Sequence, residues 1–257
     1  MNGNNLKISI VTVCFNSQAT IRDTIESVVN QTYPDIEYII VDGASTDGTL
    51  SIIDEYKDRI STVVSEPDRG IYDAMNKGVA LATGDFIGIL NSDDIFVDNT
   101  VIEKLVQFLQ KNPGLDGSYG DLVFVKRNDI NIITRTYSSK IFSPGKIRFG
   151  IMCPHPTFYA KKELFDEIGS YDISFPIAAD FDLIARFITR GAKFGRLSLV
   201  MVKMREGGVS TSGFFQRIAQ NFELVRACKK NGIYTNILMI AMKVPYKLFG
   251  YFPSSSS

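Results

Sequence analysis

The sequence contains no tryptophan, one histidine and only three cysteines in 257 residues. The cysteines lie far apart and form no CxxC pair or Cys/His cluster, so the sequence indicates neither a zinc site nor a disulfide framework. Met1–Lys7 is polar and lacks the pattern of a signal peptide. The C-terminal apolar run Ile237–Met242 is much shorter than the about 20 residues that span a bilayer. We therefore expect a cytoplasmic protein.

Neither sign of charge predominates, but the two signs are unevenly distributed along the chain. Residues 1–185 carry 16 Lys and Arg against 26 Asp and Glu, whereas residues 186–257 carry 12 against 2. An acidic body suits a divalent cation, and a basic C-terminal part suits an anionic partner such as a membrane surface. The alternative is that exposed helices simply carry Lys and Arg.

Strand-like and helix-like segments alternate in the first half of the chain. Apolar β-branched runs predict strands at 8–13, 36–41, 60–64 and 85–90, and helical spacing of apolar residues predicts helices at 19–30, 50–56, 71–82 and 99–111. This alternation indicates βαβ units and a parallel sheet.

The pattern changes after residue 115. It predicts a hairpin of 122–125 with 130–136, strands at 157–160 and 198–204, and helices at 180–189 and 214–228. The fold class is therefore α/β, with a mixed sheet that is mainly parallel in its N-terminal half and with amphipathic C-terminal helices.

Three loops follow predicted strand ends, which is where α/β sheets bind ligands. They are Cys14–Ser17, Asp42–Gly48 and Asn91–Asp94. Asp93 and Asp94 in the last loop are oxygen ligands of the kind that Mg²⁺ or Mn²⁺ takes together with substrate phosphates. The alternative is that one of them caps the segment that follows.

Several short motifs occur in order along the chain. They are ISIVTVCFN at 8–16, QTYP at 31–34, VDGASTDGT at 41–49, EPDRGIYDAMNKG at 66–78, NSDD at 91–94 and ADFD at 179–182. Together they resemble the inverting family 2 glycosyltransferases of the GT-A fold, over roughly residues 7–205. The motif at 66–78 resembles a subgroup that builds bacterial surface polysaccharides such as O-antigen, capsule or exopolysaccharide.

The resemblance implies a site for a nucleotide-sugar donor, most simply a UDP-sugar. Asp42 would contact the base of the nucleotide, and Val13 and Asn16 would lie in the same site. Arg69 would hold the donor phosphates, because a guanidinium fork matches phosphate oxygens. The alternative for Arg69 is a surface ion pair with Asp68 or Glu66.

The resemblance also implies a metal site and a catalytic base. NSDD resembles the family's DxD-type motif, so Asp93 would bind Mn²⁺ or Mg²⁺ with Asp94 beside it. Asn91 stands where the family has its first Asp, and the choice between Asp93 and Asp94 stays open. ADFD resembles the acidic motif in which Asp180 supplies the base, although Ala179 stands where the family has Glu.

Asp180 suits the role of general base for an inverting transfer. One carboxylate removes the proton of the acceptor hydroxyl while that oxygen attacks the anomeric carbon. Apolar Ile177–Ala179 precedes Asp180, and partial burial there would raise its basicity. The alternatives are that Asp180 caps a helix and that Asp182 is the base.

The only histidine, His155, lies between two prolines. The resemblance suggests that it lies near the acceptor or the diphosphate, and we assign Asp182 to the same region. A purely structural role for His155 is the alternative.

The C-terminal segment mixes apolar and aromatic residues with lysines over 234–252, which is typical of a helix lying in the plane of a membrane surface. Packing on the core or at a homodimer contact is the alternative. We divide the chain into a catalytic domain of residues 1–210, with a nucleotide-sugar-binding half (1–115) and an acceptor-side half (116–210), and a basic amphipathic extension of residues 211–257.

The expected activity is inverting transfer from a UDP-sugar to a saccharide linked to polyprenyl diphosphate, at the inner face of an anionic membrane and without a nucleic-acid partner. A sugar nucleotidyltransferase is one alternative, but residues 14–17 are not a glycine-rich phosphate loop. A non-catalytic partner subunit of the same fold is the other. Asp42, Asp93 and Asp180 favour an active enzyme.

Overall fold

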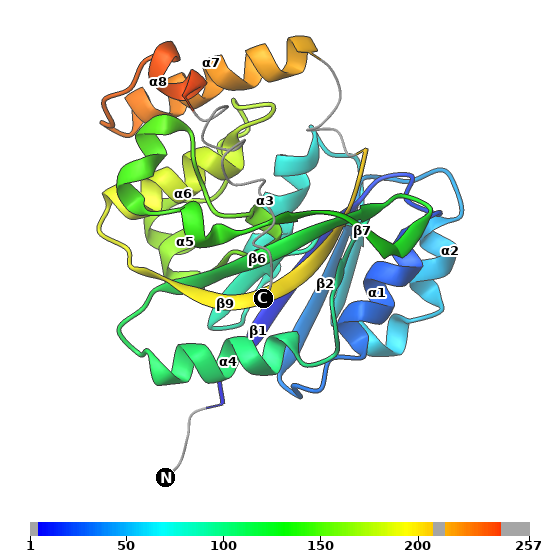
Figure 1. The fold of residues 1–257 in the computed structure, drawn as a ribbon. Coiled ribbons are helices and arrows are strands. Elements are labelled where there is room, and N and C mark those ends of the chain that lie inside the picture. The colour runs from blue at the N-terminus through cyan, green and yellow to red at the C-terminus, as the bar shows by residue number, and fades with distance from the viewer. Residues whose placement is uncertain (1–4, 208–213, 243–257) are drawn as a thin grey trace.

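A computed structural model describes residues 5–207 and 214–242 of the chain and shows a sheet with helices on both faces (Figure 1). The first half of the chain confirms the predicted alternation. Its elements are β1 (Ile8–Cys14), α1 (Ile21–Val29), β2 (Ile36–Asp42), α2 (Thr49–Asp54), β3 (Thr62–Ser65), α3 (Ile71–Leu81), β4 (Phe86–Ile89) and α4 (Val101–Lys111). All seven residues of β1 are buried, as expected of a strand covered on both faces.

The second half confirms the predicted hairpin, strands and helices, and adds short elements. It consists of β6 (Gly117–Lys126), β7 (Asp129–Tyr137), β8 (Tyr159–Lys161), α5 (Lys162–Ile168), α6 (Ala179–Thr189), β9 (Phe194–Arg205), α7 (Phe214–Lys230) and α8 (Ile237–Ala241), while the short strand β5 (Asp94–Phe96) lies earlier, between β4 and α4. The sequence did not predict β5 or α5, because three and seven residues are too few for a clear apolar period, whereas α8 lies inside the helix predicted over 234–252.

The strands form one mixed sheet in the order β3-β2-β1-β4-β8-β6-β9-β5, and β7 pairs with β6 beside this path. The neighbours β3, β2, β1 and β4 are parallel, so their carboxyl ends share one edge. β8 is antiparallel to both β4 and β6, and β5 is antiparallel to β9. The fold is thus the predicted α/β class, with a mixed sheet that is parallel over β3, β2, β1 and β4 and in which β6 and β9 of the second half also pair in parallel.

Two hydrophobic clusters lie on opposite faces of the sheet. One joins the strands to α1 and α4, through residues such as Ile25 and Leu105. The other joins them to α3, α6 and α7, through residues such as Met75, Leu183 and Leu224. The helix α3 lies close to the sheet because Gly78 has no side chain: a Cβ there would lie 2.2 Å from Val11.

The C-terminal helices belong partly to this second cluster. Leu224, Ala227 and Cys228 of α7 and Ile240 of α8 are buried in it. The predicted boundary at residue 210 stays a prediction, and most of the predicted membrane segment, from residue 243 on, lies outside the described residues. None of the helices in the described part of the chain is long and apolar enough to cross a membrane.

Candidate functional site

The three polar loops predicted at strand ends do come together at the carboxyl edge of β1, β2 and β4. The backbone N–H of Asn16 donates to Ser45 Oγ (2.8 Å), and the side-chain oxygen Oδ1 of Asn16 accepts from the backbone N–H of Thr46 (2.9 Å). The hydroxyls of Ser17 and Ser92 lie 2.8 Å apart, which joins the first loop to the third. Asn16 therefore holds the first loop against the second, because its short side chain bonds to a nearby backbone N–H.

Asp42, the last residue of β2, is fully buried beneath these loops and bonds to them. Its Oδ2 accepts hydrogen bonds from the Ser45 N–H (2.9 Å) and the Ser65 hydroxyl (2.7 Å), and its Oδ1 accepts one from the Ser45 hydroxyl (2.5 Å). Buried carboxylates need such partners. The predicted contact between Asp42 and a nucleotide base stays a prediction, and so does a role for Val13, which is buried in the core.

The backbone of the loops that follow β1 and β2 is strained at two residues, as is common at binding sites. Asn16 and Ala44 both have positive φ, at 48° and 63°, which is unusual for residues other than glycine. Gly43 lies between Asp68 and the ring of Phe15, and a Cβ there would come within 2.4 Å of the Asp68 carboxylate. The Phe15 side chain is 62% exposed at this edge. Sequence reasoning did not single out Phe15, although it lies inside the first motif.

Arg69 lies just before α3 and is open to solvent. Its Nη2 pairs with Asp73 Oδ1 at 2.6 Å, and its own N–H donates to the same carboxylate. The ion pair is thus with Asp73 and not with the Asp68 or Glu66 named as alternatives. The Arg69 side chain is 74% exposed. Only the arginine end of the pair faces solvent, because the Asp73 side chain is 11% exposed, and an anionic ligand can therefore reach the guanidinium.

Asp93 and Asp94 differ sharply in their surroundings. Asp94 is the first residue of β5 and is fully buried, whereas Asp93 in the preceding turn is partly exposed. Burial raises the pKa of both carboxyls, and the charge of Asp93 raises the pKa of Asp94 further. One oxygen of Asp94 and the side-chain oxygen of Asn91 are buried without a hydrogen-bond partner.

Two arginines lie around Asp93. The almost fully buried Arg205 of β9 donates to the Asp93 carbonyl (3.0 Å) and pairs with Asp23 of α1. Arg127, in the turn between β6 and β7, also opposes the rise of the Asp93 pKa through its charge. Both arginines line a polar cavity of about 480 Å³. The second half of the chain thereby contributes to the loop that carries Asp93.

Asp180 and His155, which are 25 positions apart in the sequence, come together beside α3. Asp180 is the second residue of α6, and its Oδ1 accepts from the Phe181 N–H at 2.7 Å. Burial raises the pKa of Asp180, and the neighbouring His155 opposes this rise. Burial also lowers the pKa of His155, and the charge of Asp180 opposes this fall.

Two tyrosines complete this second cluster. His155 Nε2 lies 2.8 Å from the Tyr171 hydroxyl, and the ring of Tyr171 stacks on that of Tyr72 with centroids 5.8 Å apart. Tyr72 is only three residues after Arg69, so the first turn of α3 links the donor loops to Asp180. Tyr72 belonged to a recognised motif, whereas nothing in the sequence pointed to Tyr171.

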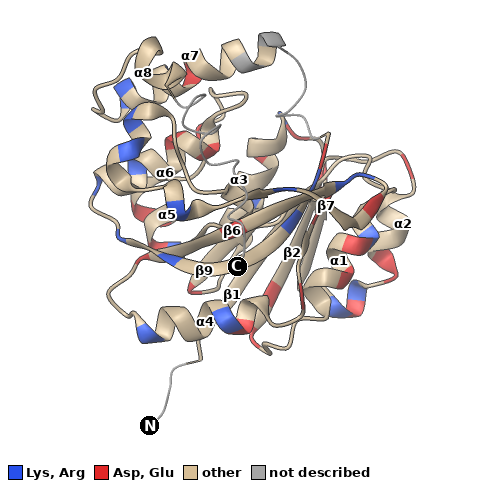
Figure 2. Cartoon of the chain, in the orientation of Figure 1, with Lys and Arg blue, Asp and Glu red and all other residues tan. Residues whose placement is uncertain are grey.

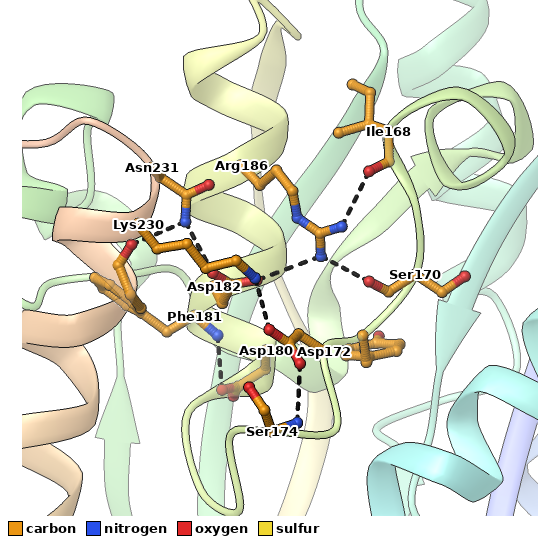
Figure 3. A network of polar contacts seen from close by, with 12 residues as sticks. Ile168, Ser170, Asp172, Ser174, Asp180, Phe181, Asp182, Arg186, Lys230 and Asn231 are labelled. Atoms are coloured by element: carbon orange, nitrogen blue, oxygen red, sulfur yellow. Dashed lines mark hydrogen bonds and ion pairs between the residues drawn. The ribbon is translucent and has the colours of Figure 1, made fainter.

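Asp182 faces away from this cluster, toward α7 (Figure 3). It is fully buried, accepts from Asn231 Nδ2 at 2.8 Å, and lies 3.4 Å from Arg186 and 3.6 Å from Lys230. Through these contacts Asp182 joins α6 to the C-terminal end of α7. Its predicted role near the acceptor stays a prediction that this geometry does not favour.

Among residues 5–207 and 214–242, no three His, Cys, Asp or Glu side chains gather closely enough to hold a metal ion by themselves. This agrees with a site for Mg²⁺ or Mn²⁺ that uses one or two carboxylates and completes its ligands with substrate phosphates. The oxygen atoms of Asp93, Asp94 and Asn91 are the appropriate chemical type. The residues therefore fit a hard cation that arrives with a diphosphate.

The mixed sheet, with its polar loops beyond β1, β2 and β4, is that of the GT-A glycosyltransferases. S. aureus TarS in complex with UDP-GlcNAc superimposes with a TM-score of 0.70 and 18% identity, over 86% of this chain and 66% of that chain. A mannosyltransferase from Pyrobaculum calidifontis, in complex with GDP-Man and Mn²⁺, gives 0.67 and 20%, over 88% and 64%. The chain thus spans about two thirds of each of these structures.

Sequence comparison then specifies the family. Residues 9–169 match Glycosyl transferase family 2, and the chain belongs to this family. It is 32% identical to the Escherichia coli UDP-Glc:alpha-D-GlcNAc-diphosphoundecaprenol beta-1,3-glucosyltransferase WfaP, over 83% of this chain and 84% of WfaP. It is 28% identical to a PGL/p-HBAD biosynthesis glycosyltransferase of Mycobacterium tuberculosis, over 79% of each chain. The predicted family and fold are confirmed.

Proposed function

We propose that this glycosyltransferase moves a sugar from a UDP-sugar to a saccharide linked to polyprenyl diphosphate, with inversion at the anomeric carbon. The observation that carries the proposal is the buried carboxylate of Asp180, with its raised pKa, beside His155 and next to the Ile177 carbonyl that Tyr72 of α3 holds. The name of WfaP, which includes a diphosphoundecaprenol-linked substrate, and the UDP-GlcNAc complex of TarS support the two substrate classes.

The donor would lie across the joined loops beyond β1, β2 and β4. The exposed ring of Phe15 offers a face on which a nucleotide base can stack. Asp42, with its oxygens already occupied, would keep the loops in place. Arg69 would exchange part of its exposed pairing with Asp73 for the donor phosphates.

Asp93 is the better metal ligand of the two adjacent carboxylates, because its side chain reaches the surface while Asp94 is fully buried. Mn²⁺ or Mg²⁺ bound there with the donor supplies positive charge to the leaving diphosphate. Asp94 and Asn91 would support the loop from inside, and Arg205 would hold its backbone through the Asp93 carbonyl.

Asp180 would act on the acceptor. Its carboxylate takes the proton of the acceptor hydroxyl while that oxygen forms a bond to the anomeric carbon and the bond to the UDP oxygen breaks. The proton ends on Asp180, and UDP leaves with the electron pair. His155, held by Tyr171, would keep the surroundings of Asp180 polar and limit the rise of its pKa.

The chain would reach a lipid-linked acceptor from the membrane surface. Large apolar side chains are exposed on α7, on α8 and between them, namely Ile218, Phe222, Tyr234, Ile237, Leu238 and Met242. The helix α7 ends in Lys229 and Lys230, of which Lys230 also pairs with Asp172. Figure 2 shows basic residues at this end of the helix, and residues of this kind attract anionic lipids. We therefore propose a peripheral position at an anionic membrane.

A thermal-shift screen of nucleotide sugars with and without Mn²⁺ tests the donor and metal proposals. A donor that binds only the folded state stabilises it by about 2.7 kcal/mol at one hundred times its Kd. We expect a metal-dependent rise of Tm with a UDP-sugar, lost in Asp93→Asn and kept in the matched surface variant Asp58→Asn. An unchanged metal-dependent rise in Asp93→Asn would contradict the metal assignment. Release of UDP on adding a polyprenyl-diphosphate saccharide then tests the transfer.

A further inference from the structure

The helix that carries Asp180 has no polar side chain at its N-cap position, although Asp180 itself accepts from the Phe181 N–H. The residue before α6 is Ala178, and its first residue is Ala179, so neither can accept a hydrogen bond from the free N–H groups of the first turn. The two N–H groups just before the helix instead find their acceptor on α7. Glu223 Oε2 accepts from the Ile177 N–H at 3.0 Å and from the Ala178 N–H at 2.9 Å.

The same turn is held from its other side by α3. The Tyr72 hydroxyl donates to the Ile177 carbonyl at 2.6 Å, so both polar groups of the Ile177 backbone are occupied, one by α3 and one by α7. Asn76 of α3 also exchanges two hydrogen bonds of 2.8 Å with the backbone of Tyr171. The loop between α5 and α6 is therefore fixed at both ends, close to Asp180.

Other residues of α7 contact this loop, but farther from Asp180 in the sequence. Arg226 donates to the Ser174 carbonyl and lies over the Phe175 ring. Lys230 bonds to Asp172 at 2.6 Å, and Asn231 just beyond the helix bonds to Asp182 (Figure 3). These contacts fasten α7 to the loop and to α6 as a whole. Glu223 alone among them bonds to the two residues that lead directly into the turn of Asp180.

We infer that Glu223 is a positioning residue for the transfer: its carboxylate, from the C-terminal helix, fixes the Ile177–Ala178 turn and with it the place of Asp180 relative to the acceptor hydroxyl. The inference rests on the proposed role of Asp180 as the base. A general base must lie within hydrogen-bond reach of its proton, and a displacement of about 1 Å can lower the rate about 10²-fold. The C-terminal helix thus belongs to the catalytic machinery.

Steady-state kinetics of three Glu223 variants test this role. Glu223→Ala removes the acceptor, Glu223→Asp withdraws it by one methylene, and Glu223→Gln keeps an oxygen in place without the charge. We expect kcat to fall about 10- to 100-fold in the Ala and Asp variants, with the donor KM and the donor-induced rise of Tm unchanged. The Gln variant should keep most of the activity, as should Glu167→Gln, a matched change at an exposed position of α5.

A double-mutant cycle with Asp180→Asn separates positioning from general stability. If Glu223 acts through Asp180, adding Glu223→Ala to Asp180→Asn should lower kcat little further. Full multiplication of the two losses, equal losses of kcat and donor binding, or full activity in the Ala and Asp variants would each overturn the inference. If Glu223→Ala does not fold, the comparison of the Asp and Gln variants decides in the same way. Retained turnover in Asp180→Asn would instead contradict the base assignment.

Discussion

The exposed apolar side chains on α7 and α8 lead to a quantitative prediction for membrane binding. The Phe222 side chain is 61% exposed and that of Leu238 is 75% exposed. Full burial of such a side chain contributes about 1.5–3 kcal/mol, so each should contribute about 1–2 kcal/mol when it enters the lipid boundary. Replacing both by serine should therefore weaken binding by about 2–4 kcal/mol, or about 30- to 700-fold in the partition coefficient.

Co-sedimentation with anionic vesicles measures this loss. Substitutions suit the question better than removal of the C-terminus, because Ile240 of α8 is fully buried and its loss would expose the core. The double variant Val63→Ser with Ile133→Ser is the matched control, since both of these apolar side chains are exposed on distant strands. Wild-type binding should weaken in high salt without vanishing, because charge and burial both contribute.

Two results would refute the reasoning. Equal sedimentation of the wild type and of the Phe222/Leu238 variant would show that this face does not enter the lipid. The wild type could instead fail to sediment and form a dimer by light scattering that the Phe222/Leu238 variant disrupts. That result would show that these side chains contact a second copy of the chain.

Two further predictions concern pH. Burial disfavours the ionised carboxylate of Glu37, but hydrogen bonds from Ser9 and Thr83 outweigh it and lower its pKa from 4.5 to about 2. The ionised Glu37 carboxylate therefore stabilises the folded state above pH 4.5, and this contribution is lost as the pH falls toward 2. Glu37→Gln should lower the free energy of unfolding by about 2 kcal/mol at pH 7 and by clearly less at pH 3. Urea unfolding measures both losses, and an equal loss at the two pH values would contradict the prediction. Burial raises the pKa of Asp180 and His155 opposes this, so His155→Asn should move the acid limb of kcat/KM to higher pH; a limb that stays in place would show that His155 does not act on the base.

Local sequence patterns were sufficient to predict most of the fold. The first four strands are apolar β-branched runs and their helices have a period of 3.6 residues, and parallel pairing places the strand ends at one edge. This is why the loops of Asn16, Ser45 and Ser92 could be grouped before their contacts were known. β5 escaped prediction because three residues show no period, and it pairs with β9, more than one hundred positions later.

The sequence also identified most of the candidate site residues but not the environment of each one. Asp42, Arg69, Asp93 and Asp180 lie in recognisable motifs, but their sequence neighbours do not determine their surroundings. Burial distinguishes Asp93 from the adjacent Asp94, and orientation distinguishes Asp180 from Asp182, which faces Asn231. Neither burial nor side-chain orientation can be predicted from the neighbouring residues in the sequence.

Glu223 and Tyr171 carried no sequence signal. Glu223 acts on a turn 45 positions earlier in the chain, through two backbone N–H groups that any residue would present. Tyr171 reaches His155 by side chains that only the folded loop brings together. Contacts of this kind require the three-dimensional structure.

The central claim is that Asp180 is the base of the transfer, and the turnover of Asp180→Asn tests it most directly. The substitution preserves the shape of the side chain and should leave the Mn²⁺-dependent stabilisation by the UDP-sugar unchanged. With a polyprenyl-diphosphate saccharide as acceptor, kcat should fall by at least ~10²-fold, the usual scale for loss of a general base. Turnover close to that of the wild type, or a comparable loss only in Asp182→Asn, would contradict the account.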